Sequence, residues 1–428
     1  MKVAISQKVL LRAIEKGGMA ALSEKAQADS SNRSKLVKSI HIKIGDELTI
    51  SSASSIIASK FSLPASKDNG IDIKEKGEAV IPAKEFFDWV SCQLPSSQIG
   101  LILKKLDTPE LINVVDSDKA EDSDKNAIRR LGTLNITSRD QSKTGVKWAL
   151  DSYDPEQLPS LVPVLELGDN ATKLFTTKVE NLKMAVSHVK FSAEKIHYQH
   201  LYDSISFYGF NGELFALATD RARCATYKID KFKDLNLPDK VLIPANYLSQ
   251  FTNMIEDGDD VTIYYDEAKN KVFVSTPDFI IRLSTADKAL WNKIPSIKIL
   301  EDKQYSDLGT IPKSLLASRL ITMTMVTKGA ALFVLKNDAM VIWAKSESSP
   351  SPMIANSPIT GLLKDTDIAI QVSHILSCIK MVKDEDIQFG IPENDQESIL
   401  IRSTEDPNFK YYIMSVNKDK LVAMREQS

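Results

Sequence analysis

Cysteine is scarce in this sequence. The chain of 428 residues has three cysteines, Cys92, Cys224 and Cys378, which lie far apart and show no CxxC spacing. Zinc sites need clustered cysteine or histidine ligands, and a disulfide framework needs a regular set of paired cysteines. We therefore expect no bound metal and no disulfide framework.

Long apolar runs are also missing. No stretch approaches the roughly 20 apolar residues that a helix needs to cross a bilayer. The opening residues MKVAISQKVLLRAIEK are interrupted by Lys8 and Arg12, so they lack the apolar core of a signal peptide. We expect no membrane contact, and we expect the chain in the cytoplasm.

The motifs of the common enzyme classes are absent. The sequence has no Walker A loop, no GxGxxG and no GxSxG, and its five histidines show no metal or triad spacing. Acidic pairs such as Asp259 and Asp260 fall where turns are expected, and carboxylates satisfy turn geometry there. We therefore expect no catalytic residues, no cofactor and no enzymatic activity.

An excess of positive charge is missing as well. Lys and Arg number 54 and Asp and Glu number 57, which gives a net charge of −3. Proteins that grip DNA by neutralising many phosphates usually carry a large positive excess. Any contact with DNA must therefore come from local basic stripes on a body that is otherwise acidic.

What the sequence does contain is internal repetition. Three helix-like segments read ISQKVLLRAIEKG from Ile5, TTKVENLKMAVSHVKFS from Thr176 and IPKSLLASRLITMTM from Ile311. Their apolar residues recur at the spacing of an amphipathic helix, as in Val179, Leu182, Val186 and Val189.

Two more families of segments follow each of these helices in the same order. The first reads as strand, helix, polar turn and strand: AVIPAKEFFDWVSCQLPSSQIGLIL, VLIPANYLSQFTNMIEDGDDVTIYY and IAIQVSHILSCIKMVKDEDIQFGI. The second reads as a hairpin of two strands: LNITSRDQSKTGVKWAL, VFVSTPDFIIRLSTA and ILIRSTEDPNFKYYIM. This order predicts three homologous domains, each with two helices and many strands.

We place the three predicted domains at residues 1–168, 169–304 and 305–428. The first is longer because residues 108–132 are polar and rich in charge, which predicts an exposed insertion or flexible loop. The third ends in a short C-terminal extension.

This order of segments resembles the bacterial beta sliding clamp, the processivity subunit of DNA polymerase III, over essentially the whole chain. The stretches that carry the resemblance are IPAKEFFDWV with Leu94 and Pro95, WALDSYDPEQLPSL, LFALATDRARCATY, VLIPANYLSQFTNMI and FKYYIMSV. None is specific by itself; their order and spacing make the match.

The resemblance implies an α+β fold of three DNA-clamp domains, each with two helices packed on antiparallel sheets. It further implies that two subunits close head to tail into a ring, a homodimer around double-stranded DNA. Such a clamp binds DNA of any sequence. It tethers a DNA polymerase through short peptides, and an ATP-driven clamp loader opens it.

Basic residues recur on the helices that would line such a ring. Lys8, Arg12 and Lys16 repeat every four residues on the first helix, and Lys183 and Lys190 share one face of the second. The predicted DNA-facing set is completed by Lys313, Arg319, Lys380 and Lys383. Any amphipathic helix also presents lysines to water, so it is the recurrence on a net-acidic chain that favours DNA.

The resemblance also implies a pocket for partner peptides between the second and third domains. The matching positions are Tyr202, Thr219, Arg223, Cys224, Gln371, His374, Tyr412 and Met414. The chain departs from the family here, because Arg221 and Ala222 replace small residues and the chain continues past Met414 to Ser428. The alternative is a purely structural role, in which Tyr412 and Met414 are ordinary core residues.

For the dimer interface we expect an edge strand at QIGLIL, with Leu101 and Leu103, to meet Leu315 and Leu316 of the third domain. The leading hypothesis is a sliding clamp. One alternative is a clamp-fold interaction protein from a phage or mobile element, which competes for clamp partners or is not loaded on DNA. Another is a monomeric DNA-binding or repair accessory protein.

Overall fold

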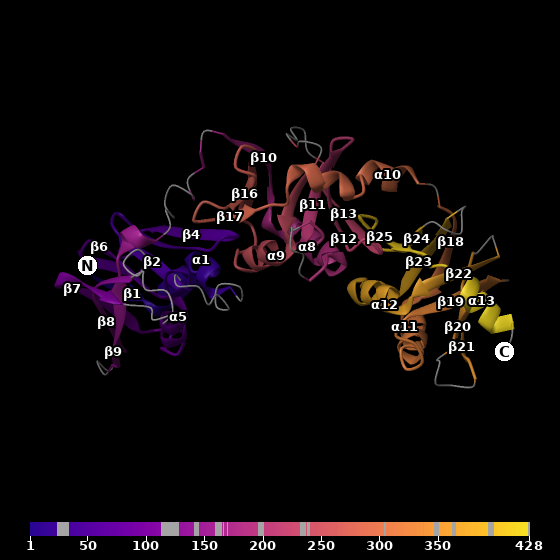
Figure 1. Ribbon diagram of the computed structural model, residues 1–428, viewed down its shortest axis with the longest axis horizontal. Coiled ribbons are helices and arrows are strands. Elements are labelled where there is room, and N and C mark those ends of the chain that lie inside the picture. The colour runs from indigo at the N-terminus through magenta and orange to yellow at the C-terminus, as the bar shows by residue number, and fades with distance from the viewer. Residues whose placement is uncertain are drawn as a thin grey trace, which may run out of the picture. The chain divides into compact units, whose positions relative to one another are not determined.

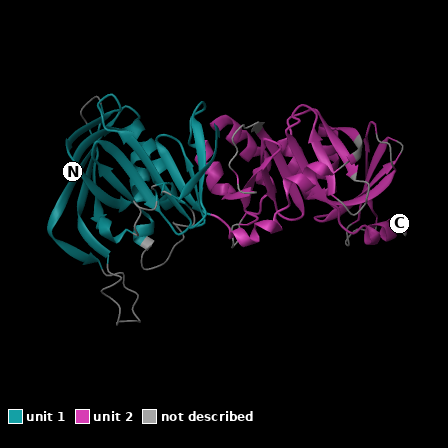
Figure 2. Ribbon diagram, turned by 90° about the horizontal axis from the view of Figure 1, so that it is seen from above, with its two compact units in different colours: residues 1–177, 254–284 teal, residues 178–253, 285–428 magenta. Residues whose placement is uncertain are grey.

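A computed structural model describes the chain (Figure 1). Outside the description lie residues 24–33, 113–127, 141–144, 159–164, 166, 169, 196–200, 232–236, 238–239, 304, 337, 346–350, 362–364, 393–397 and 427–428. Among the described helices, none is both long and apolar enough to traverse a bilayer. The chain divides into two compact units: Met1–Thr177 with Met254–Ser284, and Lys178–Asn253 with Thr285–Ser428 (Figure 2).

Unit 1 is built on a 13-stranded sheet in the order β10-β15-β16-β17-β4-β3-β2-β6-β9-β8-β7-β1-β5. Its strands are β1 (Lys2–Ser6), β2 (Ser39–Ile44), β3 (Glu47–Ala53), β4 (Ile57–Pro64), β5 (Ile71–Glu75), β6 (Gly77–Pro82), β7 (Gln98–Ile112), β8 (Ile128–Arg139), β9 (Lys147–Tyr153), β10 (Ala171–Lys178), β15 (Asp260–Asp266), β16 (Lys271–Ser275) and β17 (Phe279–Ser284). Its helices are α1 (Gln7–Gly17), α2 (Met19–Leu22), α4 (Ser34–Val37), α5 (Ala83–Ser91) and η1 (Pro155–Gln157).

Unit 2 contains an 8-stranded sheet, β14-β11-β12-β13-β25-β24-β23-β18, and a 4-stranded sheet, β21-β20-β19-β22. Its strands are β11 (Ser204–Phe210), β12 (Glu213–Thr219), β13 (Arg223–Lys231), β14 (Lys240–Pro244), β18 (Tyr305–Pro312), β19 (Ala330–Lys336), β20 (Ala339–Ala344), β21 (Met353–Pro358), β22 (Thr366–Gln371), β23 (Asp386–Pro392), β24 (Ser398–Ser403) and β25 (Phe409–Met414). Its helices are α8 (Val179–Val189), η2 (Lys190–Ser192), α9 (Ala245–Asn253), η3 (Lys288–Lys293), α10 (Ile297–Asp302), α11 (Lys313–Met323), α12 (Val372–Met381) and α13 (Asp419–Glu426).

The repeated segments form the predicted elements. The helix-like segments are α1, α8 and α11, and each packs beside the helix of the following segment: α5, α9 or α12 (Figure 1). The apolar stripe of α8 is buried, because Val179, Leu182, Val186 and Val189 face the sheet. The expected α+β fold, with helix pairs on antiparallel sheets, is confirmed. The boundaries at residues 168 and 304 stay a prediction, because the two units divide the chain differently.

The insertion at residues 108–132 is only partly a loop. Strand β7 runs on to Ile112 and β8 begins at Ile128, and the two stay paired from Glu110 with Arg130 to Ile112 with Ile128. The two flanks are therefore an insertion that extends a hairpin, and the alternative of a flexible loop is wrong for them. Its centre, residues 113–127, lies outside the described residues.

The C-terminal extension forms helix α13 on the 4-stranded sheet. Leu421, Val422 and Met424 pack against a buried cluster that includes Trp343. An ion pair of 3.1 Å between Arg425 and Asp367 holds the end of the helix. The extension thus covers apolar surface of the third repeat.

Two seams join successive repeats, and we call them the first and second seam. In the first seam β17 pairs antiparallel with β4, so that Phe279 lies opposite Phe61. The ammonium group of Lys16 lies 5.4 Å and 5.7 Å from these two rings, and 3.0 Å from the carboxylate of Asp278. An ammonium enclosed by rings and an acid is fully desolvated, so it needs that acid to remain charged.

The second seam repeats this construction with other residues. Strand β25 pairs antiparallel with β13, so that Phe409 lies opposite Tyr227. The imidazole of His188 packs on both rings, at 4.8 Å from Tyr227 and 5.5 Å from Phe409. Its Nε2 atom lies 3.9 Å from the carboxylate of Asp406. Lys16 and His188 are each the tenth residue of an 11-residue helix.

Replacing Asp278 by Asn should destabilise unit 1. The Lys16 side chain is 2% exposed, and the substitution leaves its charge without a carboxylate. Loss of one partner of a buried pair costs about 3–5 kcal/mol, and Asp278 is partly exposed, so we expect about 2–3 kcal/mol. Urea unfolding measures this, with the exposed Asp68→Asn as control. Equal midpoints for the two variants would show that the pair does not stabilise the seam.

Candidate functional site

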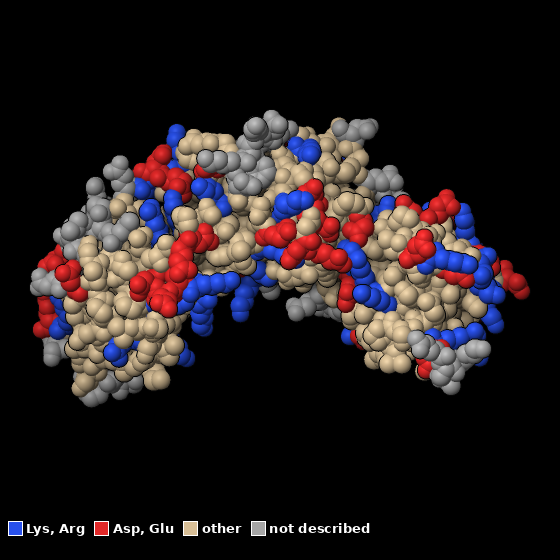
Figure 3. Space-filling view, turned by 180° about the vertical axis from the view of Figure 1, so that it is seen from behind, with Lys and Arg blue, Asp and Glu red and all other residues tan. Residues whose placement is uncertain are grey.

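The predicted DNA-facing residues divide into exposed and engaged side chains. Lys8, Arg319, Lys380 and Lys383 are exposed on or next to α1, α11 and α12. Lys183 and Lys190 are half-buried, and burial lowers the pKa of Lys190 because it disfavours the charged form. In Figure 3, Lys and Arg form small groups beside groups of Asp and Glu, with no continuous basic field.

Three residues of this set are used inside the protein. Lys16 is buried in the first seam, so its assignment to DNA is wrong. Arg12 forms ion pairs with Glu256 at 3.1 Å and Asp278 at 3.2 Å, which offset its charge. Lys313 donates a hydrogen bond of 2.9 Å to the carbonyl of Val382, just after α12. A spacing of four residues placed Lys16 on the polar face, but the next repeat covers that turn of α1.

The predicted partner pocket centres on a tight turn between β12 and β13. Thr219 Oγ1 donates to the carbonyl of Arg223 at 2.6 Å, and Asp220 accepts from the backbone N–H groups of Ala222 and Arg223. Arg221 adopts a φ of 78°, a left-handed conformation that is uncommon for a residue with a side chain. Its exposed guanidinium stacks 5.0 Å over the Tyr202 ring and binds Glu194 at 3.0 Å.

Arg223 connects this turn to the third repeat. Its Nε donates to Asp220 at 2.7 Å, and its guanidinium lies 6.0 Å from the Phe191 ring. It also interacts with the hydroxyl of Tyr411, which donates to the carbonyl of His374 at 3.0 Å. Burial lowers the pKa of His374, and the charge of Arg223 lowers it further. Arg223 therefore fixes the turn against α12.

The remaining pocket residues lie at different depths. Thr219, Cys224 and Tyr412 are buried, and Cys224 is paired with Tyr412 across β13 and β25. They support the surface from beneath and do not form its exposed wall. Met414 is 46% exposed, and its N–H donates to the carbonyl of Ala222 in the turn.

Gln371 and His374, at and after the start of α12, are half-buried. Gln371 donates to the carbonyl of Lys328 at 2.9 Å. Val416, 42% exposed, bridges to Ala369 in β22, so residues 414–416 run from the turn to β22. Sequence reasoning missed Phe191, Tyr411 and Val416, because the run FKYYIM is apolar on both faces and does not reveal which tyrosine faces the helix.

The predicted dimer edge is wrong. QIGLIL lies in β7, which is paired on one side with β1 and on the other with β8. Leu101 and Leu316 are fully buried, and Leu103 and Leu315 are half-buried. An alternating apolar strand looks the same whether or not its edges are paired, so the sequence could not exclude the two neighbours.

Several strands end a sheet or have a largely unpaired edge within the described chain, and two of them, β9 and β21, correspond to strands that pair in the two seams. Strand β9 is paired with β8 along its length, but its other edge meets β6 only at Tyr153 with Val80. Strand β21 is the terminal strand of its sheet and is paired only with β20. Beside the β9 edge, Trp148 stacks on Trp89 of α5 with ring centres 6.2 Å apart.

Apolar side chains are exposed on the elements next to β21. Ile321 of α11 is 52% exposed, Met325 just after α11 is 79% exposed, and Ile354 in β21 is 59% exposed. Strand β21 and helix α11 pack together, so this edge carries both unpaired backbone and apolar surface. Exposed apolar surface at a free strand edge is typical of an association surface.

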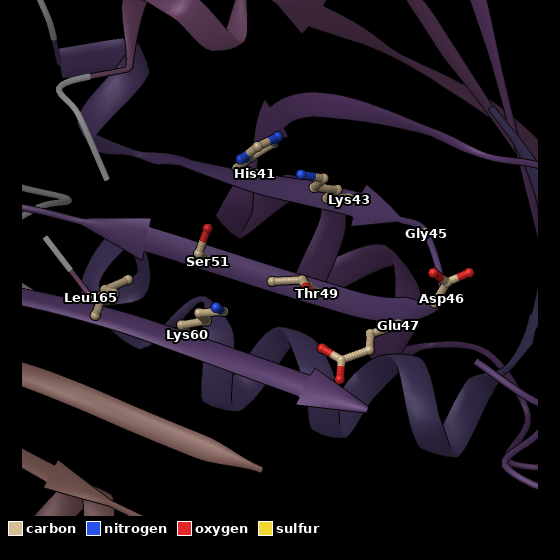
Figure 4. A pocket seen from close by; sticks show the side chains of 9 residues that line it. All are labelled: His41, Lys43, Gly45, Asp46, Glu47, Thr49, Ser51, Lys60 and Leu165. Carbon is tan, nitrogen blue, oxygen red and sulfur yellow. The ribbon is translucent and has the colours of Figure 1, made fainter. Parts of the chain in front are cut away.

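A cavity of about 320 Å³ lies on β2, β3 and β4 of unit 1 (Figure 4). It is lined by His41, Lys43, Gly45, Asp46, Glu47, Thr49, Ser51, Lys60 and Leu165, so both charge signs are present and none of the predicted site residues takes part. Burial lowers the pKa of His41, whose Nε2 lies 3.0 Å from Glu78. In the part of the chain that is described, no three His, Cys, Asp or Glu side chains could hold a metal.

No protein-family profile and no curated protein matches the sequence. Solved structures do resemble it. The pol III beta protein of Caulobacter crescentus has a TM-score of 0.75 at 14% identity, covering 97% of this chain and 100% of that one. The beta subunit from DNA polymerase of Streptococcus pyogenes has a TM-score of 0.73 at 14% identity, with the same coverage. A Pseudomonas aeruginosa sliding clamp bound to griselimycin has a TM-score of 0.75 at 14% identity, covering 97% and 99%. This likeness establishes the fold.

The thiols should differ sharply in reactivity. Cys92 is exposed, whereas Cys224 and Cys378 are buried, and burial raises the pKa of both buried thiols. Because the thiolate is the reactive form, we expect one fast-reacting thiol per native chain and three after unfolding. Titration with a thiol-specific chromogenic reagent at pH 8 measures this, and Cys92→Ser should abolish the fast phase. Fast labelling of Cys224 in the folded protein would show that the turn is open.

Proposed function

We propose that the protein is a DNA sliding clamp: two copies close into a ring around duplex DNA and tether a polymerase to it. The fold is that of bacterial sliding clamps. One observation within the chain supports the ring most strongly. The first and second seams are formed by equivalent pairs of strands. The two strands that are equivalent to these in one more seam, β9 and β21, each keep an unpaired edge.

A second copy of the chain would pair with the free edges of β9 and β21. In both existing seams the last strand of one repeat pairs with the strand that follows the first hairpin of the preceding repeat. Strands β9 and β21 occupy these same two positions in the first and third repeats. A head-to-tail contact between unlike edges closes when the rotation per copy returns to the start, and in a ring of two copies every β9 edge meets a β21 edge.

The charge distribution fits a ring that moves along DNA. Four of the nine predicted DNA-facing cations, Lys8, Arg319, Lys380 and Lys383, are exposed outside the seams, and the chain has a net charge of −3. Contacts with phosphates do not read sequence and weaken with salt. A ring stays on DNA because it is closed, so a few weak contacts are sufficient and do not prevent sliding.

The turn at residues 219–223 and the neighbouring Met414 form the proposed partner surface. Met414 and Val416 supply exposed apolar area, and Arg221 supplies a cation beside it. A short peptide of a polymerase or a clamp loader would add its apolar side chains to this area. The proposed role needs no catalytic group and no cofactor.

The alternative is a clamp-fold protein that competes for clamp partners or is not loaded on DNA. Two features favour it: Arg221 alters the partner turn, and α13 adds surface to the third repeat. Retention on DNA distinguishes the two functions.

Light scattering over a dilution series should give twice the mass of one chain at micromolar concentration. Subunits mixed with DNA while dilute, and then concentrated, should remain on a nicked circular plasmid during gel filtration in 300 mM NaCl. Cutting the plasmid once should release them, because a ring can slide off an end. A chain that is monomeric at micromolar concentration, or is retained equally on cut DNA, would contradict the ring. A dimer that never remains on the circle would favour the alternative.

Charge reversal on α12 should weaken the binding of DNA without opening the ring. In Lys380→Glu/Lys383→Glu, the slope of log affinity against log salt should fall by about 1 for each phosphate that the two lysines no longer neutralise. Fluorescence anisotropy on a short duplex at several salt concentrations measures the slope. The matched control is Lys104→Glu/Lys105→Glu on β7, where both lysines are also exposed. An equal decrease in both variants would assign the effect to net charge alone.

A further inference from the structure

The two existing seams predict the chemistry of a third. Helices α1, α8 and α11 each have 11 residues, and the tenth is Lys16, His188 and Thr322 in turn. Lys16 and His188 both cover an aromatic pair and face an aspartate. Thr322 is the one residue of the three that has no charged form.

The strand positions can be matched in the same way. Phe61 and Tyr227 each lie opposite the fourth residue of the preceding strand, Ile50 of β3 and Ala216 of β12. The fourth residue of β20 is Ile342, and it lies opposite Ala355. The third repeat therefore presents a methyl group where the other two present a ring.

The opposite side of this seam would come from β9. The closing strand starts with Phe279 in the first seam and with Phe409 in the second, and the corresponding aromatic residue of β9 is Trp148, its second residue. Asp278 directly precedes Phe279, and Asp406 lies three residues before Phe409. At the same two distances before Trp148 stand Lys147 and Gly145, so no acid is supplied.

We infer that the ring closes through a seam without an ion pair at its centre, in which Trp148 of the second copy packs over Ala355 and beside Thr322. A large ring against a small residue fills the space that two rings fill elsewhere. This inference rests on the proposed ring of two copies.

The exposed apolar residues next to β21 fit this arrangement. Met325 is the thirteenth residue counted from the start of α11, and Phe191 has the same place after α8. Phe191 packs on Tyr411, with ring centres 5.2 Å apart, two residues beyond the aromatic start of β25. Met325, 79% exposed, is therefore placed to contact the second copy in the same way.

Two consequences follow from the missing ion pair. Burial of apolar surface depends little on ionic strength, so closure should resist salt that removes the protein from short duplex DNA. The third seam also lacks the contact with an aspartate that Lys16 makes in the first seam and His188 in the second, so it is the seam that opens when DNA enters. Salt would then weaken the contacts between the ring and DNA, whereas separation of the two copies would release the ring from DNA.

The experiment measures the dimer dissociation constant by sedimentation at 50 and 300 mM NaCl. The wild type should change by less than about threefold, because no ion pair is broken. Trp148→Ala should weaken association by about a hundredfold, as expected for a central aromatic contact. The matched control, Ile299→Ala on α10, removes an exposed apolar side chain away from both edges and should change nothing.

A double-mutant cycle tests the residue pairing. Thr322→Lys and Lys147→Asp together should restore the ion pair of the first seam, so the double variant should bind about tenfold more tightly than the two single changes predict. Its dissociation constant should also become sensitive to salt. Ala355→Trp fills the proposed space from the other side and should abolish association while each chain keeps its unfolding midpoint.

The possible failures are distinguishable. A wild-type chain that stays monomeric overturns the proposed ring. Three results would leave the ring intact and overturn this seam. They are a dissociation constant unchanged by Trp148→Ala and Ala355→Trp, no coupling in the double-mutant cycle, and a dimer that dissociates readily in salt.

Discussion

The pairing of strand edges between successive repeats is the constraint on which the rest of the structure depends. A β-strand has two hydrogen-bonding edges, and an edge without a partner costs free energy or attracts another chain. In both seams the closing hairpin of one repeat supplies the missing partner for a strand of the preceding repeat. An aromatic pair and a residue from the first helix then fill the space behind the strands.

The seams also explain why some charged residues are unavailable to a ligand. Lys16 lies at a helical spacing that would suit phosphate contacts, yet it is enclosed by Phe61, Phe279 and Asp278. An ammonium in such a place stabilises the joint between repeats. Within the predicted DNA-facing set, Lys8, Arg319, Lys380 and Lys383 are the cations exposed outside the seams, and this small number fits the proposed ring, which would stay on DNA by enclosing it.

The partner turn shows how a rigid support can hold an unusual backbone. Hydrogen bonds of the Asp220 and Thr219 side chains stabilise the turn, and the Arg223 side chain connects it to Tyr411 of the third repeat. This support keeps Arg221 at a φ of 78° with its guanidinium exposed above Tyr202. Backbone strain held in place by its surroundings is common where a protein binds something. The family resemblance led to this turn, but Arg221 is this chain's own feature.

Apolar spacing is a local property that survives in each copy of a segment, so the repeats, the helix pairs and the α+β class could be predicted from the residues alone. The turn at residues 219–223 was proposed as a partner surface from the family resemblance and not from a local pattern. Three facts came from the packed structure: Lys16 is buried, Leu101 lies in a strand paired on both edges, and β9 and β21 each have an edge without a strand partner along most of their length. These facts depend on which distant strand occupies a neighbouring edge. Residues more than 200 positions apart make that choice, as Phe61 and Phe279 do, and no local pattern records it.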